Sequence, residues 1–393
     1  MRGRARNPFC GPPGFGLKQI LGIAGAQDIS SWFENGHVSF VHKGRTAIRH
    51  ACDLLGLSAE HEVLAPAYNC GSEIDALLHS GASVVLYPVD RSCQVNITDL
   101  EGRITSKTKA VFLIHYFGFP QSVIEIRKFC EKYGLYLIED CALSLFSCDG
   151  MMKLGTVGDV SAFSLPKTLP VPDGGVFFVN RSDSTLRSWY LTPPSNAAVL
   201  MNVLPLLKSA ILRLSSNVPL LFGFFLFILS RRHYSLARAD CSEKDESKLP
   251  DMPKCYYYDE DVSDKAISFI SKWMLKAFDV HEIRKRRREN FCRYLELLSG
   301  YSSIEPLFKE LGDGICPLYF PVLVKNRLTV CQELNDQSIA AIAWWSGYHR
   351  GLPWEKFPDA CFLKDNLLVL PVHQQLNLAE ITFIAERAIS AVR

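Results

Sequence analysis

Between residues 38 and 180, short apolar runs alternate with longer amphipathic stretches, and this alternation is the feature that most restricts the possible folds. The amphipathic stretches, such as 44–57 and 122–133, carry apolar side chains at helical spacing. The apolar runs are typical of strands buried on both faces and comprise 38–41, 62–65, 83–88, 110–118, 135–140 and 175–180. Such strands separated by helices predict an α/β fold whose mainly parallel sheet is covered by helices.

A chain of 393 residues exceeds one ordinary core, so several parts are expected. We expect an N-terminal lead-in at 1–36, a large domain at 37–198, an apolar helical insertion with a linker at 199–262, and a small C-terminal α+β domain at 263–393. Within that last part the pattern predicts one long helix over 263–298. Its basic run 284–288 is either a recognition patch or, as is more common, the solvated face of a helix. Strands are predicted at 319–324, 339–344 and 367–370.

Net charge and cysteine content limit the partners and the cellular compartment that the chain suits. The formal net charge of +2 argues against nucleic acid as the main partner. The 13 cysteines contain no C-x-x-C pair, which favours a reducing, cytoplasmic compartment and gives no metal-ligand spacing. We therefore predict no metal site.

Two residues in the middle of the predicted sheet suggest a cofactor site. Asp140 ends a predicted buried strand, and Lys167 lies between two prolines before an Asp-Gly-Gly turn. This pair suits pyridoxal phosphate (PLP), because the lysine would form a Schiff base and the aspartate would keep the pyridinium nitrogen protonated. The alternatives are a solvated loop lysine and an aspartate that caps a helix. Ligands bind at the carboxyl ends of parallel strands, so residues 43–46, 68–70 and 115–116 are expected beside Asp140.

The segment 199–230 is intensely apolar and is followed by Arg231-Arg232-His233. Charged residues, serines and a proline interrupt it, and only 218–229 forms a clean apolar run, shorter than the roughly 20 residues of a spanning helix. One interpretation is helices buried against the domain or a partner subunit. The other is an interfacial anchor that contacts a membrane, which would place the protein at the inner face of a membrane.

Six stretches, taken in order, resemble one known family. They are GRTAIRHACDLLGL, HEVLAPAYNC with its downstream GASVVLYPVD, TKAVFLIHYFGFP, LYLIEDCALS, FSLPKTLPVPDGGVFFVN and NLLVLPVHQQL. Together they are similar to the PLP-dependent sugar aminotransferases of the DegT/StrS type, which have fold type I. The resemblance covers residues 36–180 closely and 262–393 more loosely.

The resemblance implies an aminotransferase that moves an amino group, with glutamate as the donor, to a keto-sugar on a nucleotide or lipid carrier in polysaccharide biosynthesis. It also implies a homodimer. Lys167 and Asp140 would be the catalytic residues. Alternatives are another PLP-dependent reaction on a membrane-linked substrate, or an inactive binding protein with the same fold.

By the same resemblance, the turn of Gly44, Arg45 and Thr46 would hold the cofactor phosphate at a helix N-terminus. Ser164 matches the phosphate-binding serine of the family, with Ser161 as the second choice.

Some positions depart from the family pattern. Cys70 replaces an aromatic residue that covers the cofactor ring, and Tyr68 is a substitute two residues earlier. Leu143 replaces a glutamine, and the lysine loop is two residues shorter than usual.

Three histidines fall in segments that resemble elements on the substrate side. They are His115, His349 and His373, although a lone histidine is more often a packed or capping residue.

Overall fold

The computed structural model describes residues 10–23, 29–33, 36–180, 190–215 and 251–393. Its larger part is built around a seven-stranded sheet in the order β1-β9-β8-β5-β4-β2-β3. The strands are β1 (His37–Val41), β2 (Glu62–Pro66), β3 (Ser83–Tyr87), β4 (Thr108–Ile114), β5 (Tyr136–Asp140), β8 (Val160–Ser164) and β9 (Gly175–Val179). Strands β3, β2, β4, β5 and β8 are parallel, whereas β9 is antiparallel to both β8 and β1. The predicted fold class, a mainly parallel α/β sheet, is confirmed.

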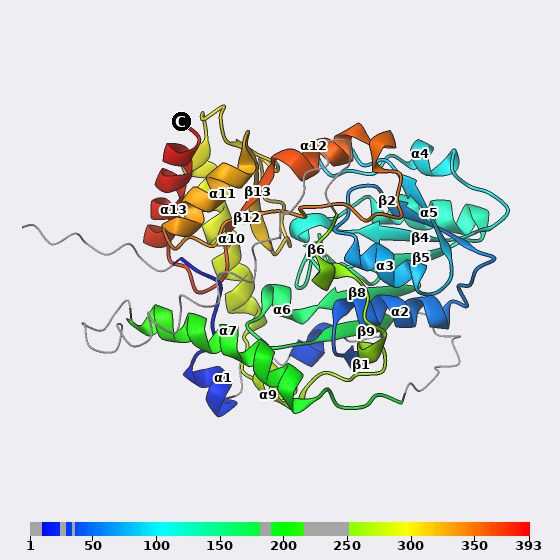
Figure 1. The fold of residues 1–393 in the computed structure, drawn as a ribbon, viewed down its shortest axis with the longest axis horizontal. Helices are drawn as coiled ribbons and strands as arrows, with labels where there is room; N and C mark the ends of the chain where they lie inside the picture. The colour runs from blue at the N-terminus through cyan, green and yellow to red at the C-terminus, as the bar shows by residue number, and fades with distance from the viewer. Residues whose placement is uncertain (1–9, 24–28, 34–35, 181–189, 216–250) are drawn as a thin grey trace, which may run out of the picture.

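Helices join these strands and cover the sheet (Figure 1). They are α2 (Gly44–Leu54), α3 (Ser72–Leu78), α4 (Ile97–Glu101), α5 (Val123–Tyr133) and the short α6 (Leu165–Thr168). Helix α5 ends where Gly134 adopts a φ of +64°, a left-handed conformation that glycine takes without a steric cost. A two-stranded hairpin, β6 (Cys148–Asp149) with β7 (Met152–Lys153), follows β5.

The sequence pattern did not predict strand β8. Its sequence VSAFS contains two serines, which interrupt the apolar run that marks the neighbouring strands. The strand nevertheless lies near the centre of the sheet, where it pairs with β5 on one side and β9 on the other. Helix α6 follows it directly, so Lys167 lies one short turn beyond a strand end.

The smaller part contains a four-stranded antiparallel sheet in the order β10-β11-β13-β12. Its strands are β10 (Glu305–Pro306), β11 (Tyr319–Leu323), β12 (Ile342–Ala343) and β13 (Leu367–Pro371), and its helices are α10 (Val280–Leu298), α11 (Arg327–Asp336), α12 (Pro358–Asn366) and α13 (Leu378–Ala391). This α+β arrangement agrees with the expectation, but the strand predicted at 339–344 is reduced to the two residues of β12.

The prediction of one helix over 263–298 was wrong. The chain forms α9 (Phe269–Leu275) and then α10, because the Asp279 side chain accepts a hydrogen bond from the Glu282 N–H (3.1 Å) and caps a new helix. The arginine run is also not simply solvated. Arg284 and Arg288 donate to main-chain carbonyls, and Arg287 is only 1% exposed.

Helix α7 (Asn196–Ser215) lies with α1 (Leu17–Leu21) and α9 along the lower edge of Figure 1. It exposes several large apolar side chains: Leu200, Met201, Leu204 and Leu207. Among the helices that the structure describes, none is both long and apolar enough to cross a membrane. Residues 216–230, the second half of the apolar segment noted above, lie outside the described residues.

Candidate active site

Strand ends converge at one edge of the large sheet. The register pairs Val41 with Gly175, and Gly175 with Ser164, so the ends of β1 and β8 and the start of β9 are neighbours. Asp140 ends β5, the strand next to β8. The sequence-based expectation that these ends share one edge therefore agrees with the topology.

Two glycines permit a very close approach at this edge. A Cβ on Gly44 would lie 3.2 Å from the Ser164 Cβ, and one on Gly175 would lie 2.3 Å from the Lys43 carbonyl oxygen. Gly44 begins α2, whose first N–H groups point out of the helix and favour an anion. Ser164 is half-buried and faces this turn from the end of β8. The turn and the serine together form a narrow cradle suited to a phosphate group.

Lys167 lies on α6, and Pro166 is the second residue of that short helix, where a missing N–H costs no intrahelical bond. The side chain of Lys167 is half-buried. The turn is held from the smaller part of the protein, because the buried Arg287 of α10 donates to the Thr168 carbonyl (2.9 Å). This support could not be predicted, since in a sequence an arginine that will bind main-chain oxygens looks like any other charged helix residue.

Asp140 is a buried carboxyl at the same edge of the sheet. Its Oδ1 accepts the Ala142 N–H (2.8 Å). Burial, and next the negative charge of Glu73, raises the pKa of Asp140 to about 6, while the charge of Lys167 acts in the opposite direction. Lys167 and Asp140 are therefore close enough to interact electrostatically, as their predicted roles require.

Glu73 is a second buried carboxyl at this site, and sequence reasoning missed it. It begins the first turn of α3 and accepts hydrogen bonds from the Cys70 N–H (2.8 Å) and the Cys70 thiol (2.5 Å). Burial, followed by Glu73, raises the pKa of Cys70 to about 12, so Cys70 stays a neutral thiol. An acidic residue in the first turn of a helix is an ordinary stabilising feature. Its position on the chain therefore did not distinguish it.

A second lysine, Lys364, is buried near Cys70 and Glu73. Lys364 of α12 donates to the carbonyls of Trp345 (3.2 Å) and Gly347 (2.8 Å). Burial lowers the pKa of Lys364 to about 8, and the nearby Cys70 and Glu73 partly offset that effect. The candidate site thus contains two carboxyls and two lysines.

Two predicted phosphate ligands are engaged elsewhere. The Arg45 guanidinium donates to the carbonyl oxygens of residues 255–257, at distances between 2.6 and 3.1 Å. The buried Thr46 hydroxyl donates to the Val262 carbonyl (3.3 Å). Both side chains therefore bond to the protein itself, and their contact with a phosphate stays a prediction.

The two candidate serines differ clearly in their surroundings. Ser161 is fully buried and donates to the Gly155 carbonyl (2.8 Å), whereas Ser164 lies against Gly44. This difference favours Ser164 as the phosphate ligand.

Tyr68 lies in a buried aromatic cluster. Its ring centroid is 4.9 Å from that of Trp345 and 5.5 Å from that of Tyr116. Its hydroxyl is buried and has no hydrogen-bond partner among the described residues. The environment of Tyr68 is that of a core residue, and a role over a cofactor ring stays a prediction.

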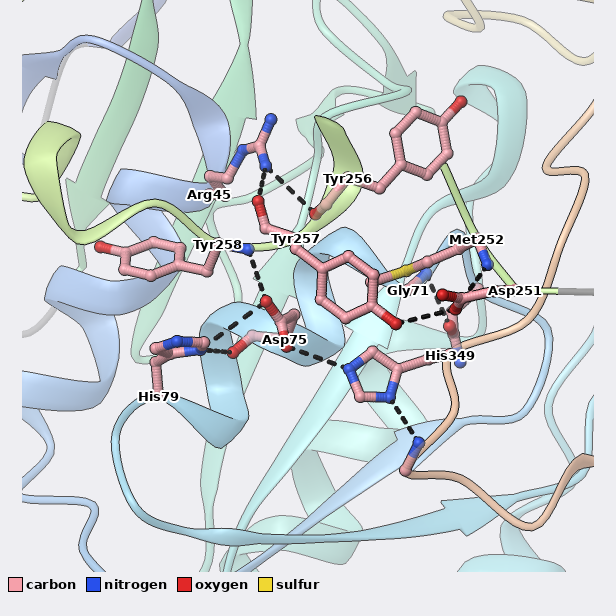
Figure 2. A network of polar contacts seen from close by, with 12 residues as sticks. Arg45, Gly71, Asp75, His79, Asp251, Met252, Tyr256, Tyr257, Tyr258 and His349 are labelled. Atoms are coloured by element: carbon pink, nitrogen blue, oxygen red, sulfur yellow. Dashed lines mark hydrogen bonds and ion pairs between the residues drawn. The ribbon is translucent and has the colours of Figure 1, made fainter. Parts of the chain in front are cut away.

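The three candidate substrate histidines are all buried and bonded. His115 interacts through Nε2 with Glu139 (2.9 Å), and His373 through Nε2 with the Gly11 carbonyl (3.0 Å). His349 pairs through Nε2 with Asp75 (3.0 Å), within the polar network of Figure 2. Each therefore has a structural partner, and a contact with substrate stays a prediction without geometric support.

His115, Glu139 and Cys141 also bring one ligand atom each within 4.8 Å of one another. Glu139, however, already accepts main-chain N–H groups from residues 155, 157 and 158. His115 accepts the Gln121 N–H at Nδ1, so its Nε2 carries the proton that is donated to Glu139. The potential ligand atoms of His115 and Glu139 thus already make hydrogen bonds within the protein, which argues for a structural role.

The comparisons with known proteins agree with this geometry. Residues 26–189 match the DegT/DnrJ/EryC1/StrS aminotransferase family. A GDP-perosamine synthase from Vibrio cholerae is 34% identical over 147 residues, which are 37% of this chain and 40% of that protein. A dTDP-4-dehydro-2,3,6-trideoxy-D-glucose 4-aminotransferase from Saccharopolyspora spinosa is 35% identical over 144 residues, covering 36% of this chain and 37% of that protein. The chain thus matches about two fifths of the length of these curated relatives.

Among solved structures, a putative sugar aminotransferase from Streptococcus pneumoniae in its PMP form is similar over 98% of both chains, with a TM-score of 0.68 and 16% identity. This likeness extends the shared fold over both parts of the molecule. The fold is that of the PLP-dependent sugar aminotransferases, as expected from the resemblance.

Proposed function

We propose that this protein is a PLP-dependent aminotransferase that moves an amino group from glutamate to a keto-sugar carried on a nucleotide or a lipid. The observation that carries the proposal is that buried Asp140 ends β5 while Lys167 follows directly on the neighbouring strand β8, at the edge where Gly44 and Ser164 lie close together. The family match over 26–189 supports the reaction class, and the names of the relatives support a nucleotide-sugar acceptor.

The residues present fit the cofactor. Gly44 and Ser164 lie so close together that an added Cβ at residue 44 would crowd the Ser164 side chain, which supports a role for this turn and serine in holding the phosphate. Once bound, PLP would supply an electron sink for the carbon that carries the amino group. Asp140 would hold a proton at the pyridine nitrogen, and the Lys167 amine would attach the cofactor and move a proton to and from substrate.

Borohydride reduction after incubation with PLP tests this proposal. The wild-type protein is expected to retain reduced cofactor on the peptide that contains Lys167, detected by mass spectrometry. Lys167→Ala is expected to retain none. Lys364→Met is the matched control, because it removes the other amine near the site. Wild-type protein without label, or label that persists in Lys167→Ala, would contradict the proposal.

The amino donor and acceptor need a separate measurement. Glutamate is expected to convert the bound cofactor to its amine form, which changes the visible spectrum without any acceptor present. Adding nucleotide-linked keto-sugars should restore the original spectrum. If glutamate leaves the spectrum unchanged while other amines change it, the donor assignment fails and the cofactor assignment stands.

A second candidate is a different PLP-dependent reaction on a membrane-linked substrate. The exposed Leu200, Met201, Leu204 and Leu207 on α7 favour it, because they lead into the apolar segment that ends at residue 230. Co-sedimentation with anionic vesicles tests the contact. Replacing these four residues with serine should reduce binding, and unchanged sedimentation would remove the membrane from the proposal.

We also propose a homodimer, as in the family. The exposed Phe269 and Trp273 of α9 support an apolar interface. Light scattering on the purified protein is expected to give twice the mass of the 44.2 kDa chain, and a monomer at micromolar concentration would contradict this.

A further inference from the structure

Asp173 is a buried carboxyl near the end of the lysine loop, here residues 165–174, which contains α6 and leads into β9. Its Oδ1 accepts the Ser268 N–H (2.9 Å), and its main-chain N–H donates to the Ser271 hydroxyl (3.2 Å). Ser268 also caps α9, because its side chain accepts the Ser271 N–H (3.2 Å). Asp173 therefore ties the lysine loop to the start of α9.

His42, the residue after β1, holds the same loop from the other side. Its carbonyl accepts the Gly174 N–H (2.8 Å), and its N–H donates to the Lys265 carbonyl (2.9 Å). Two residues further along the chain, Gly44 begins the turn that is proposed to hold the phosphate, here called the Gly44 turn. His42 and Asp173 thus lie where the lysine loop meets the segment that leads into the Gly44 turn.

The side chains of His42 and Asp173 face each other without forming a hydrogen bond. His42 Nδ1 lies 3.8 Å from Asp173 Oδ2, which exceeds the length of a hydrogen bond. Both atoms are buried, and neither has a hydrogen-bond partner among the described residues. A buried polar atom without a partner costs free energy, so such a pair beside a functional site requires an explanation.

The charges around this pair keep the imidazole neutral. Burial lowers the pKa of His42, Asp173 acts in the opposite direction, and the positive charges of Lys43 and Arg45 lower the pKa further. An anion in the Gly44 turn would oppose the effect of these two charges, because it would lie beside both residues. The protonated imidazole, which carries a donor at both ring nitrogens, would then be favoured.

We propose that His42 and Asp173 are positioning residues of the candidate site, and that an anion bound in the Gly44 turn makes His42 take up a proton and bond to Asp173. The inference rests on the proposed function. The proton comes from solvent and stays on the imidazole, and no covalent bond to carbon, nitrogen or phosphorus changes. The new bond from Nδ1 to Oδ2 joins the end of β1 to the lysine loop. Binding of the cofactor phosphate thereby fixes the loop that carries Lys167.

The test measures PLP affinity by fluorescence titration of the apoprotein at pH 6, 7 and 8. Asp173→Asn keeps an oxygen for the Ser268 N–H but removes the charge that stabilises the imidazolium. Its affinity should equal that of wild type at pH 8 and be about tenfold weaker at pH 6, since proton uptake strengthens binding only where His42 can be charged. His42→Gln should give the same pattern. Comparing variants at one pH cancels the titration of PLP itself.

His50→Gln is the matched control. His50 is another buried histidine on α2, and its Nε2 already bonds to the Ser263 carbonyl (2.9 Å). The ratio of its PLP affinity to that of wild type should stay constant from pH 6 to pH 8. A ratio that falls about tenfold at pH 6, as expected for His42→Gln, would overturn the assignment to His42.

Amide hydrogen exchange tests whether the new bond fixes the loop. At pH 6, PLP should increase the protection of amides 169–175 in wild type at least about threefold more than in Asp173→Asn. Equal protection in the two proteins would contradict the positioning role. Melting temperatures of the apoproteins show whether each variant is folded. If Asp173→Asn is poorly folded, His42→Gln removes the same bond and decides the question.

The outcomes separate this inference from the proposed function. If Asp173→Asn and His42→Gln bind PLP like wild type at every pH while Lys167→Ala still loses the reduced label, the inference is wrong and the proposed function stands. An affinity loss of equal size at every pH would also overturn the proton uptake, because it would trace to the bonds with Ser268 and Ser271 alone. If wild-type protein binds no PLP, both are wrong.

Discussion

Glu139 and Asp140 are consecutive acidic residues at the end of β5, and the pKa values of their side chains shift in opposite directions. Burial raises the pKa of Glu139, but the bonds from His115 and from the N–H groups of 157 and 158 outweigh that effect and bring the pKa below its ordinary value. Asp140 has one main-chain donor, and its pKa rises to about 6. The comparison shows that burial alone does not identify a functional carboxyl. Asp140, which has the single donor and whose raised pKa is partly offset by the charge of Lys167, is the candidate for chemistry.

The largest expected effect follows from Asp140→Asn. An amide cannot stabilise a positive charge at the pyridine nitrogen, so the rate of amino transfer should fall at least about 100-fold. The apoprotein should remain folded, since only one hydrogen bond to Ala142 is affected. Stopped-flow measurement of the glutamate half-reaction checks the rate. A loss of rate smaller than tenfold would show that Asp140 takes no part in the reaction.

Glu139→Gln should act on stability instead. The carboxylate accepts bonds from His115 and three main-chain N–H groups, and an amide presents only one oxygen to them. Leaving buried donors without partners should lower the free energy of unfolding by about 3 kcal/mol. Urea unfolding of the apoprotein measures this loss. A variant as stable as wild type would remove the contrast between the two acids.

The pH dependence of stability should also differ in sign between the two acids. The folded pKa of Asp140, about 6, exceeds its ordinary 3.8, so the folded state binds the proton more tightly and stability falls as pH rises through this interval. Asp140→Asn removes that penalty, and its apoprotein should gain up to about 3 kcal/mol over wild type between pH 4 and pH 7. For Glu139, with a lowered pKa, the stabilisation is present above its ordinary 4.5 and is lost as pH falls. Urea titrations at several pH values test both signs, and parallel curves would contradict them.

The smallest effects are expected for the two serines of β8. Ser164→Ala should weaken PLP binding about tenfold, since a hydrogen bond to an anion is lost, and should leave the melting temperature of the apoprotein unchanged. Ser161→Ala should do the reverse and cost about 1 kcal/mol of stability through the lost bond to Gly155. Titration and thermal unfolding of both variants distinguish them. Equal PLP affinities would reject Ser164 as a ligand.

The sequence predicted the sheet and the two central residues because both leave local patterns. Buried parallel strands are near-continuous apolar runs, and Asp140 follows one of them directly. Strand β8 was missed because its serines interrupt the apolar run. The helix over 263–298 was predicted too long because the apolar spacing continues across Asp279, although Asp279 caps the start of a new helix.

The other residues around the site could not be predicted, for a different physical reason. Glu73 looks like an ordinary residue of a helix's first turn, although it is bonded to Cys70 and lies beside Asp140. The contacts of Arg45 and Tyr256 join positions more than 200 residues apart, and they depend on main-chain carbonyls that every residue carries. No periodicity in a single sequence marks such contacts. They appear only when the chain is folded.

The hydrogen bonds of Arg287 have a practical consequence for truncating this protein. Its side chain joins Thr168, in the part matched by the family model, to Gln374 and to the carbonyls of residues 317 and 318. A truncated product that ends after β9 would lack this guanidinium, and the carbonyl that follows the lysine would lose its donor. The stretch most easily identified by sequence comparison is therefore not expected to be a self-sufficient unit for expression or engineering, and exchanges between homologues should transfer α6 and α10 together.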